Sequence, residues 1–514
     1  MKHKSVYRII LILILFLSFF LRVYKLDSKP VWYDEAVSIS NAEKPLSSYL
    51  FSSRINYKPV YFFLLNIWIS VFGENAFNLR FFSLIWGVSS ILLIYELAKA
   101  MFNNEVGWIS AFLLGISVFH IFNCQQIRHF SLLVFLALAS VICFLKFIRK
   151  NKIPYLIMLT IANILVINTH PYGFCVIIFE VFFAIFFLRG NLLRHWFFSQ
   201  LILSLFVAWY LFLPNKAYLK ETIWWIQKPN LNSLIETFNT FSWGGPRYGL
   251  DDFRIPEPWL ALAYILSFSY LVLFLCGLQI KRKEDSRNIL LLLLWIVMTV
   301  GMSFLLSIMN DSSVYSIKHL IIALPAFYII IARGLSKFGK HLKIVIVTGL
   351  CFLHIVPLCI MYNNYFCTDW KESTEYLKGL TKGSEVVIVA SLHEIVPFMY
   401  YFNDHKPSLQ DIDIYGKITK NKYDNNVFVA SNDTLIIGVH QTGFRNKNIT
   451  TEEDFEKKVI NSRFLKNKRI WLMLSRWLDP GAKKYIFCYL DKNFKKVEYR
   501  KFQGVEVYCF IPLS

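Results

Sequence analysis

An acidic pair near the start of the chain is the first group that could do chemistry. Asp34 and Glu35 directly follow Trp32-Tyr33, shortly after the first long apolar run. A carboxylate at a membrane surface can act as a general base on an acceptor hydroxyl. The pair also fits a simpler role, in an ordinary loop or at the start of the helix that follows. Seen alone, the two residues leave both interpretations open.

Basic and imidazole side chains follow at places where apolar runs end. Lys58 opens the apolar stretch 59–72, where its amine could bind a lipid phosphate or extend to the headgroup level. Arg128 lies in a turn between two apolar runs, which fits a phosphate partner or a helix-end anchor. His170 and the pair Lys318-His319 also lie at the ends of apolar runs, where a lone histidine is often only a structural hydrogen-bonding group.

The elements that must position these side chains are membrane helices. The chain is 56% hydrophobic and 17% charged, with a mean hydropathy of +0.45, whereas soluble domains carry about 25% charged residues. Apolar runs long enough to span a bilayer recur through residues 1–361. The first run follows Lys2 and Lys4 without a small-residue cleavage site after it. We therefore expect a retained helix rather than a cleaved signal peptide.

The sequence predicts about eleven transmembrane helices. Their expected ranges are 6–24, 80–101, 106–123, 128–148, 153–169, 171–188, 197–214, 258–279, 287–309, 318–335 and 342–361. Basic clusters fall between alternate helices, which the positive-inside rule assigns to the cytoplasm. The loop 25–79, the turns at Arg128 and His170, and residues 362–514 then lie outside, with 59–72 as an interfacial helix. This topology puts the candidate residues on one face.

The last part of the chain has a different pattern. Short apolar runs at 386–390, 434–439 and 470–474 alternate with polar, periodic stretches such as 369–378 and 452–458. This alternation predicts a small α/β domain over residues 362–514. Nine cysteines lie mostly inside apolar runs, which indicates buried thiols, although Cys488 and Cys509 could pair in this domain.

The net charge of +21 is concentrated in short loops between apolar runs. Such a charge suits anionic lipid headgroups and topology rather than nucleic acid. We expect no nucleic-acid partner, and the sequence offers no cluster of metal ligands. The partners expected are membrane lipids and a phosphate-bearing substrate.

In its motifs the chain resembles the C-type (GT-C) glycosyltransferases, those of the protein mannosyltransferase (glycosyltransferase family 39) and aminoarabinose transferase kind. The motifs are Val31-Trp-Tyr-Asp-Glu-Ala36, Lys58-Pro-Val-Tyr61, Phe72-Gly73, Leu79-Arg80-Phe-Phe-Ser83, Gln126-Ile-Arg128-His-Phe-Ser-Leu-Leu133, Thr169-His170-Pro-Tyr-Gly173, Lys318-His-Leu-Ile-Ile-Ala-Leu-Pro325 and Asp369-Trp-Lys371. They follow in order through most of residues 1–380. The resemblance implies transfer of a sugar from a polyprenyl-phosphate carrier to a protein, lipid or glycan acceptor outside the cytoplasm, with inversion.

The resemblance also implies roles for single residues. Asp34 is similar to the loop acid that acts on the acceptor hydroxyl, with Glu35 beside it. Donor-phosphate binding falls to Lys58, Arg128 and Lys318. Substrate binding falls to Tyr61, Gln126, His129, His170 and His319. The scheme requires no cofactor, although a divalent cation is compatible with it, and it places the protein in the plasma or inner membrane.

Several positions depart from the common pattern of this group. Val60 replaces a second proline, Gln126 a frequent acid, His129 a tyrosine and Lys318-His319 a frequent Arg-Tyr, so the sugar and the acceptor stay open. A transporter or flippase of lipid-linked anions is the alternative function, but transporters place polar groups near the bilayer midplane. A membrane-anchored binding protein is a third reading.

Overall fold

The computed structural model describes most of the chain. The described residues are 2–44, 59–212, 226–244, 257–280, 283–363, 368–381, 385–390, 394–403, 427–429, 435–439, 465, 467–476, 478 and 480–513. The chain divides into two compact units. The helical unit comprises residues 1–26, 44–73 and 77–365, and the sheet unit comprises residues 27–43, 74–76 and 366–514.

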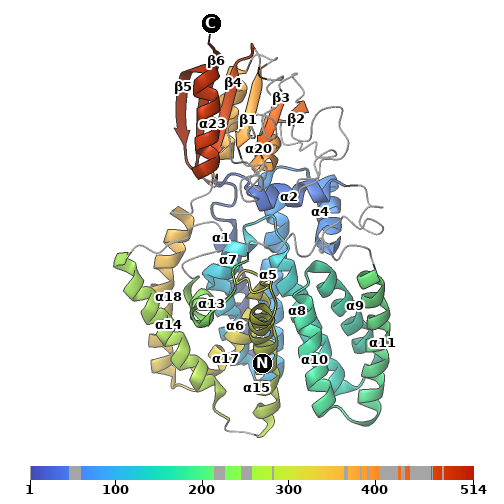
Figure 1. Ribbon diagram of the computed structural model, residues 1–514. Coiled ribbons are helices and arrows are strands. Elements are labelled where there is room, and N and C mark those ends of the chain that lie inside the picture. Colours follow the sequence, from blue (N-terminus) through green and yellow to red (C-terminus); the bar gives the residue numbers. More distant parts are fainter. Residues whose placement is uncertain are drawn as a thin grey trace. The chain divides into compact units, whose positions relative to one another are not determined.

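The helical unit consists of apolar helices in the order expected (Figure 1). They are α1 Lys2–Val23, α4 Pro59–Phe72, α5 Ala76–Met101, α6 Asn104–Ile116, α7 Val118–Cys124, α8 Phe130–Lys150, α9 Ile153–Thr169, α10 Gly173–Phe187, α11 Gly190–Phe212, α13 Leu231–Trp243, α14 Glu257–Leu278, α15 Lys283–Ile296, η1 Val297–Gly301, α16 Met302–Met309, η2 His319–Ala323, α17 Leu324–Ser336 and α18 Lys340–Asn363. Each predicted transmembrane range falls on one of these helices or on consecutive ones.

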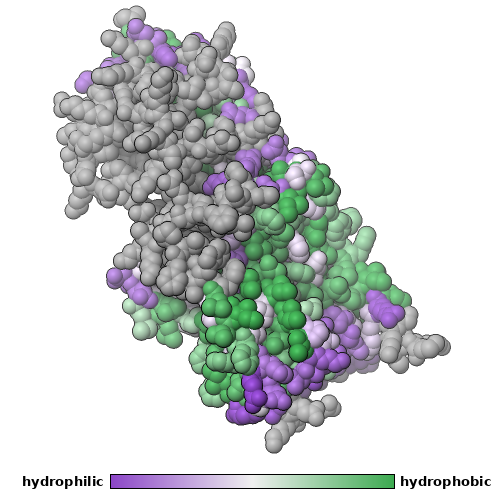
Figure 2. Space-filling model, turned by 90° about the vertical axis from the view of Figure 1, so that its right-hand side faces the viewer, coloured by the Kyte–Doolittle hydropathy of each residue, from purple (hydrophilic) through white to green (hydrophobic). Residues whose placement is uncertain are grey.

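Length and hydropathy identify the helices able to cross a bilayer. Within the described residues, six helical segments pass this test, and the bent pair α6 and α7, which turns by 62°, adds a seventh. The helices α4, α9 and α10 are apolar but shorter. On the face drawn in Figure 2, hydrophobic residues cover the middle of the helical unit and hydrophilic residues gather at its end. Exposed apolar surface of this extent fits lipid contact. The chain is a multi-pass membrane protein.

Two local features of the helical unit follow from turn chemistry. A break separates α9 from α10 at His170-Pro171, as expected, because proline cannot continue the preceding helix. No helix was predicted between residues 214 and 258, where the structure has α13. That helix begins with a capping box at Asn230 and Ser233 and ends at Gly244, whose φ is +108°. The helix was missed because it is short and amphipathic, whereas the prediction relied on long apolar runs.

Arg22 holds the bend between α6 and α7. Its fully buried guanidinium donates to the carbonyl oxygens of Leu114 and Gly115 at 3.1 and 2.9 Å, and to His120 Nδ1 at 2.7 Å. The carbonyls at the end of α6 lack helical partners, so a cation is well placed there.

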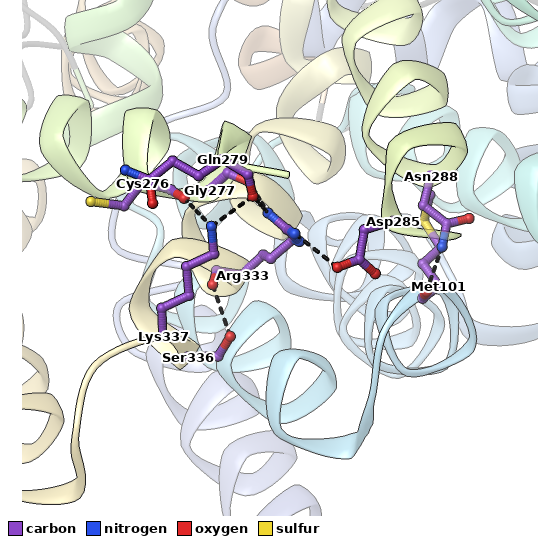
Figure 3. A network of polar contacts seen from close by, with 9 residues as sticks. All are labelled: Met101, Cys276, Gly277, Gln279, Asp285, Asn288, Arg333, Ser336 and Lys337. Carbon is purple, nitrogen blue, oxygen red and sulfur yellow. Dashed lines mark hydrogen bonds and ion pairs between the residues drawn. The ribbon is translucent and has the colours of Figure 1, made fainter. Parts of the chain in front are cut away.

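A polar network joins the loops at one end of the helical unit (Figure 3). Arg333 donates to Gly277 O, to Gln279 O at 2.9 Å and to Asp285 Oδ2 at 2.9 Å. Lys337 Nζ donates to Cys276 O at 2.6 Å and to Gln279 O at 2.8 Å. Two cations therefore satisfy the last carbonyls of α14, where the helix dipole favours positive charge. Both belong to the basic clusters that the sequence assigns to one side of the membrane.

Glycines let α14 and α17 approach each other closely. A Cβ added to Gly334 would lie 1.9 Å from Leu273 O, and one added to Gly277 would lie 2.1 Å from Ile330 O. Backbones at this separation exclude any side chain. Small residues at such contacts are typical of helices packed within membranes, where dispersion and close approach replace the hydrophobic effect.

The sheet unit has the predicted α/β character. Its described elements are α2 Tyr33–Ala42, α19 Trp370–Leu380, β1 Val386–Ala390, α20 Ile395–Phe402, β2 Val427–Val429, β3 Leu435–Val439, β4 Ile470–Ser475, α23 Pro480–Asn493, β5 Phe494–Phe502 and β6 Val505–Pro512. The strand order is β2-β3-β1-β4-β6-β5, with β1 parallel to both β3 and β4 and the other pairs antiparallel. The three predicted strands are β1, β3 and β4, whereas the hairpin β5–β6 was not predicted. The predicted polar stretch 452–458 lies outside the described residues.

The sheet core forms between the central strands and α23 (Figure 1). Ile388 and Leu472 on the strands and Ile486 and Leu490 on α23 are buried together. Cys509, between the core residues Tyr508 and Phe510 on β6, is also buried, and burial raises the pKa of its thiol to about 11. Cys488 and Cys509 are both free thiols, so the pairing considered from the sequence is absent.

Candidate functional site

The turn between α7 and α8 brings the first candidate residues of the helical unit together. Gln125 ends α7 and fixes the turn to α1, because its Nε2 donates to Arg22 O at 3.0 Å and to Tyr24 O at 2.8 Å. Gln126 and Arg128 follow, 7% and 6% exposed, and the backbone N–H of Arg128 donates to Gln126 O at 2.8 Å. The turn that carries Arg128 is therefore buried and held by hydrogen bonds.

Three histidines from distant parts of the chain stack beside this turn. The rings of His129 and His170 lie 4.7 Å apart and are tilted by only 7°. His319, at the start of η2, lies 4.4 Å from His170 at 39°. His129 and His170 are 1% and 6% exposed. The structure thus unites His129, His170 and His319, which the sequence could only assign separately to the ends of helices.

Hydrogen bonds fix the orientation of this stack. The backbone N–H of Tyr172 donates to His170 Nδ1 at 3.2 Å, so a neutral His170 carries its proton on Nε2. The Tyr172 hydroxyl donates to Val314 O at 2.5 Å and so ties the turn at His170 to the segment before η2. Tyr172 was overlooked in the sequence, although it stands two residues after His170 in the motif. Its position in that turn was the available signal.

Tyr61 joins the short apolar helix α4 to the same cluster. Its buried hydroxyl lies 3.1 Å from Ser83 Oγ, and Ser83 Oγ donates to Arg128 O at 3.2 Å. The rings of Tyr61 and His129 meet edge to face at 6.2 Å. The candidates Tyr61, Arg128, His129, His170 and His319 therefore form one cluster, which we call the histidine cluster. Lys318, half-buried, caps η2 directly before His319.

The acidic pair occupies the first turn of α2 in the sheet unit. Asp34 is half-buried and Glu35 is 1% exposed. The helix begins after Trp32, whose carbonyl accepts from the N–H of Ala36 at 2.9 Å, and Ser38 Oγ donates to Asp34 O at 2.9 Å. Two carboxylates in a first turn are favourable, because they face the positive end of the helix dipole. The helix start considered from the sequence is present at this position.

Two further candidates are Lys58 and a metal site. Lys58, assigned to the donor phosphate, lies outside the described residues. In the part of the chain that the structure describes, no group of three or more His, Cys, Asp or Glu side chains is arranged to hold a metal ion. Among the three histidines, the rings of His129 and His170 are stacked and that of His319 is tilted against His170.

The fold is that of the GT-C glycosyltransferases. The apo oligosaccharyltransferase of Archaeoglobus fulgidus superposes with a TM-score of 0.56 at 14% identity, covering 98% of this chain and 74% of that one. ArnT from Cupriavidus metallidurans, bound to undecaprenyl phosphate, superposes with a TM-score of 0.55 at 9% identity, covering 99% and 98%. The fold expected from the resemblance is thereby confirmed.

Sequence comparison agrees with the fold. Residues 56–218 match the family model described as dolichyl-phosphate-mannose-protein mannosyltransferase. An uncharacterized protein of Aquifex aeolicus is 25% identical over 362 residues, which are 68% of this chain and 67% of that protein. The putative mannosyltransferase YkcB of Bacillus subtilis is 25% identical over 169 residues, 30% of this chain and 23% of that protein. The chain is therefore related to membrane glycosyltransferases.

Proposed function

We propose that this protein transfers a sugar from a polyprenyl-phosphate carrier to an acceptor at the extracytoplasmic surface of the cell membrane, with inversion. The observation that carries the proposal is the histidine cluster at the helix ends of a GT-C fold, with the buried Arg128 directly before His129. Solved relatives of this fold contain dolichol-phosphate or undecaprenyl phosphate. The shared fold makes a lipid phosphate the natural ligand to test.

The chemistry of the cluster suits an anionic leaving group. A guanidinium keeps its charge at any physiological pH and presents several donors to a phosphate. Imidazole rings beside it can donate hydrogen bonds from their N–H groups. In the proposed site Arg128, Lys58 and Lys318 hold the carrier phosphate. Tyr61, Gln126, His129, His170 and His319 bind the rest of the donor and the acceptor.

The reaction needs one carboxylate on the acceptor side. The bond between the sugar C1 and the carrier phosphate oxygen breaks, and the pair of electrons leaves with the phosphate, whose charge is stabilised by the cations. The acceptor oxygen attacks the opposite face of C1, and its proton passes to Asp34, with Glu35 beside it. A single displacement of this kind inverts the configuration at C1. No cofactor is part of the scheme.

The test is transfer by the purified full-length protein in lipid. Radiolabelled polyprenyl-phosphate sugars are offered with a panel of protein, lipid and glycan acceptors, and the labelled product is isolated. Transfer of label to one acceptor class, with the opposite anomeric configuration, is the expected result. Label that crosses the bilayer while still attached to its carrier would instead identify a flippase and contradict the proposal.

A further inference from the structure

The helix that carries Asp34, α2 of the sheet unit, is buried along most of its length. Every residue from Glu35 to Ala42 is buried, although the sequence of α2 is short and only weakly apolar. The helix packs against α20, whose residues are also all buried (Figure 1). Such a short, weakly apolar helix has little stability of its own, so its position depends on the elements around it.

One side-chain hydroxyl fixes the chain immediately before α2. The backbone N–H of Val31, a fully buried residue, donates to Tyr401 Oη at 2.5 Å. Tyr401 lies on α20, and its neighbour Tyr400 donates to Glu74 O at 3.4 Å. A buried N–H that lost its acceptor would bear the full cost of desolvation. The entry to α2 is therefore hydrogen-bonded to α20.

The helix α20 is in turn held by the sheet. It begins after Glu394, beyond the carboxyl end of the central strand β1. Glu394 accepts from Trp370 Nε1 at 2.6 Å and from Ser475 Oγ at 3.4 Å, which are residues of α19 and of the end of β4. Residues of α19 and β4 thus hold the residue directly before the helix that supports α2. The carboxyl ends of parallel strands are a common location for functional segments in α/β domains.

We infer that Tyr401 is a positioning residue for Asp34, and that the sheet unit acts in transfer by holding the acid-bearing helix in place. The inference rests on the proposed function, because it concerns the residue proposed as the base. A carboxylate that acts as a general base must stay within hydrogen-bonding reach of the acceptor hydroxyl. Loosening of residues 27–43 would thus lower the rate of the chemical step and leave carrier binding unchanged.

Hydrogen exchange of the full-length protein in lipid tests the contact without reference to activity. In Tyr401→Phe, which keeps the ring and removes the hydroxyl, amides of residues 27–43 should exchange about five- to a hundred-fold faster, while those of β1 and β4 stay unchanged. Tyr376→Phe is the matched control, because its hydroxyl contacts Glu498 elsewhere in the same unit. Unchanged exchange of residues 27–43 in Tyr401→Phe would overturn the inference.

Kinetics then separate positioning from simple support of the fold. Tyr401→Phe should lower kcat about ten- to a hundred-fold with an unchanged KM for the carrier, whereas Tyr376→Phe keeps both values. Faster exchange with a wild-type kcat would also overturn the positioning role. A wild-type protein without transfer activity would contradict the proposed function, and the exchange comparison would still decide whether Tyr401 holds the segment.

Discussion

Asn163 Nδ2 donates to Glu180 Oε2 at 2.8 Å inside the helical unit, on α9 and α10. Ser140 Oγ of α8 closes a ring with both residues, at 2.5 Å from Asn163 Oδ1 and 2.8 Å from Glu180 Oε1. All three side chains are fully buried. Three contacts need three hydrogens. The hydroxyl and the amide supply one each in either orientation of the amide, so the third must come from the carboxyl.

The ring predicts that Glu180 is a neutral, protonated side chain that joins three helices. Glu180→Gln should therefore leave thermal stability nearly unchanged, since the amide supplies the same hydrogen, whereas Glu180→Ala should cost about 2–4 kcal/mol. Thermal unfolding in detergent measures both variants. Infrared spectra should show a carboxylic-acid carbonyl band that Glu180→Gln removes. Strong destabilisation by Glu180→Gln would mean that the carboxyl is ionised instead.

Arg128→Ala should weaken carrier binding about ten- to a hundred-fold, because a buried charge-assisted contact with phosphate is lost. Titration with polyprenyl phosphate in nanodiscs measures the affinity. Arg189→Ala removes an arginine at the end of α10 that the site does not use, and it should bind as the wild type does. Equal affinity of Arg128→Ala and wild type would exclude Arg128 from the phosphate site.

Gly334→Ala should destabilise the helical unit by about 1–3 kcal/mol or more, because its Cβ would meet the backbone of α14 at Leu273 O. Gly349→Ala is the natural comparison, since nothing lies within 4 Å of its Cβ on α18. That variant should be neutral or slightly stabilising, as alanine is the better helix former. Unfolding temperatures of the two variants should differ clearly, and equal values would show that α14 and α17 can separate without cost.

Acid should loosen the junction of α23 and β6. Partial burial alone would raise the pKa of Glu506, but hydrogen bonds from Lys483 Nζ at 2.7 Å and Tyr508 Oη at 2.9 Å outweigh it and lower the pKa below 4.5. A lowered carboxyl pKa adds stability above pH 4.5, and this contribution is lost as the pH falls through the folded-state value. Relative to the intrinsic exchange rate at each pH, the protection of β6 amides should therefore fall below pH 4.5 in the wild type. In Glu506→Gln this pH dependence should be smaller. Identical pH profiles of the variant and the wild type would contradict the role of Glu506.

Long apolar runs made the helical unit predictable from the sequence. Hydropathy and charge bias located every described helix that is long and apolar, and the proline after His170 marked a break that the structure contains. Amphipathic α13 was not predicted, and a helix starting at Asp34-Glu35 was only one of two open interpretations, because tertiary packing rather than local pattern stabilises both helices. The hairpin β5–β6 escaped because its strands carry many charges on the exposed side.

The candidate residues could be singled out from the sequence, but the contacts between them could not. The motifs singled out His129, His170 and His319 separately, and only the packing of α8, α10 and η2 shows that their rings stack. The hydrogen bond between Val31 and Tyr401 could not be predicted from the sequence. The two residues are far apart in the chain, and a lone tyrosine on an apolar helix does not indicate which residue it contacts. Long-range hydrogen bonds of this kind are set by tertiary structure alone.

The most direct measurement is sugar transfer by Asp34→Asn beside carrier binding by the same variant. The purified protein in lipid is supplied with a radiolabelled polyprenyl-phosphate sugar and the acceptor that the wild type uses. We expect transfer to hydroxyl acceptors to fall by at least about a hundred-fold while carrier affinity is retained, since the asparagine keeps the shape and cannot take the proton. Transfer at a near-normal rate would contradict the account.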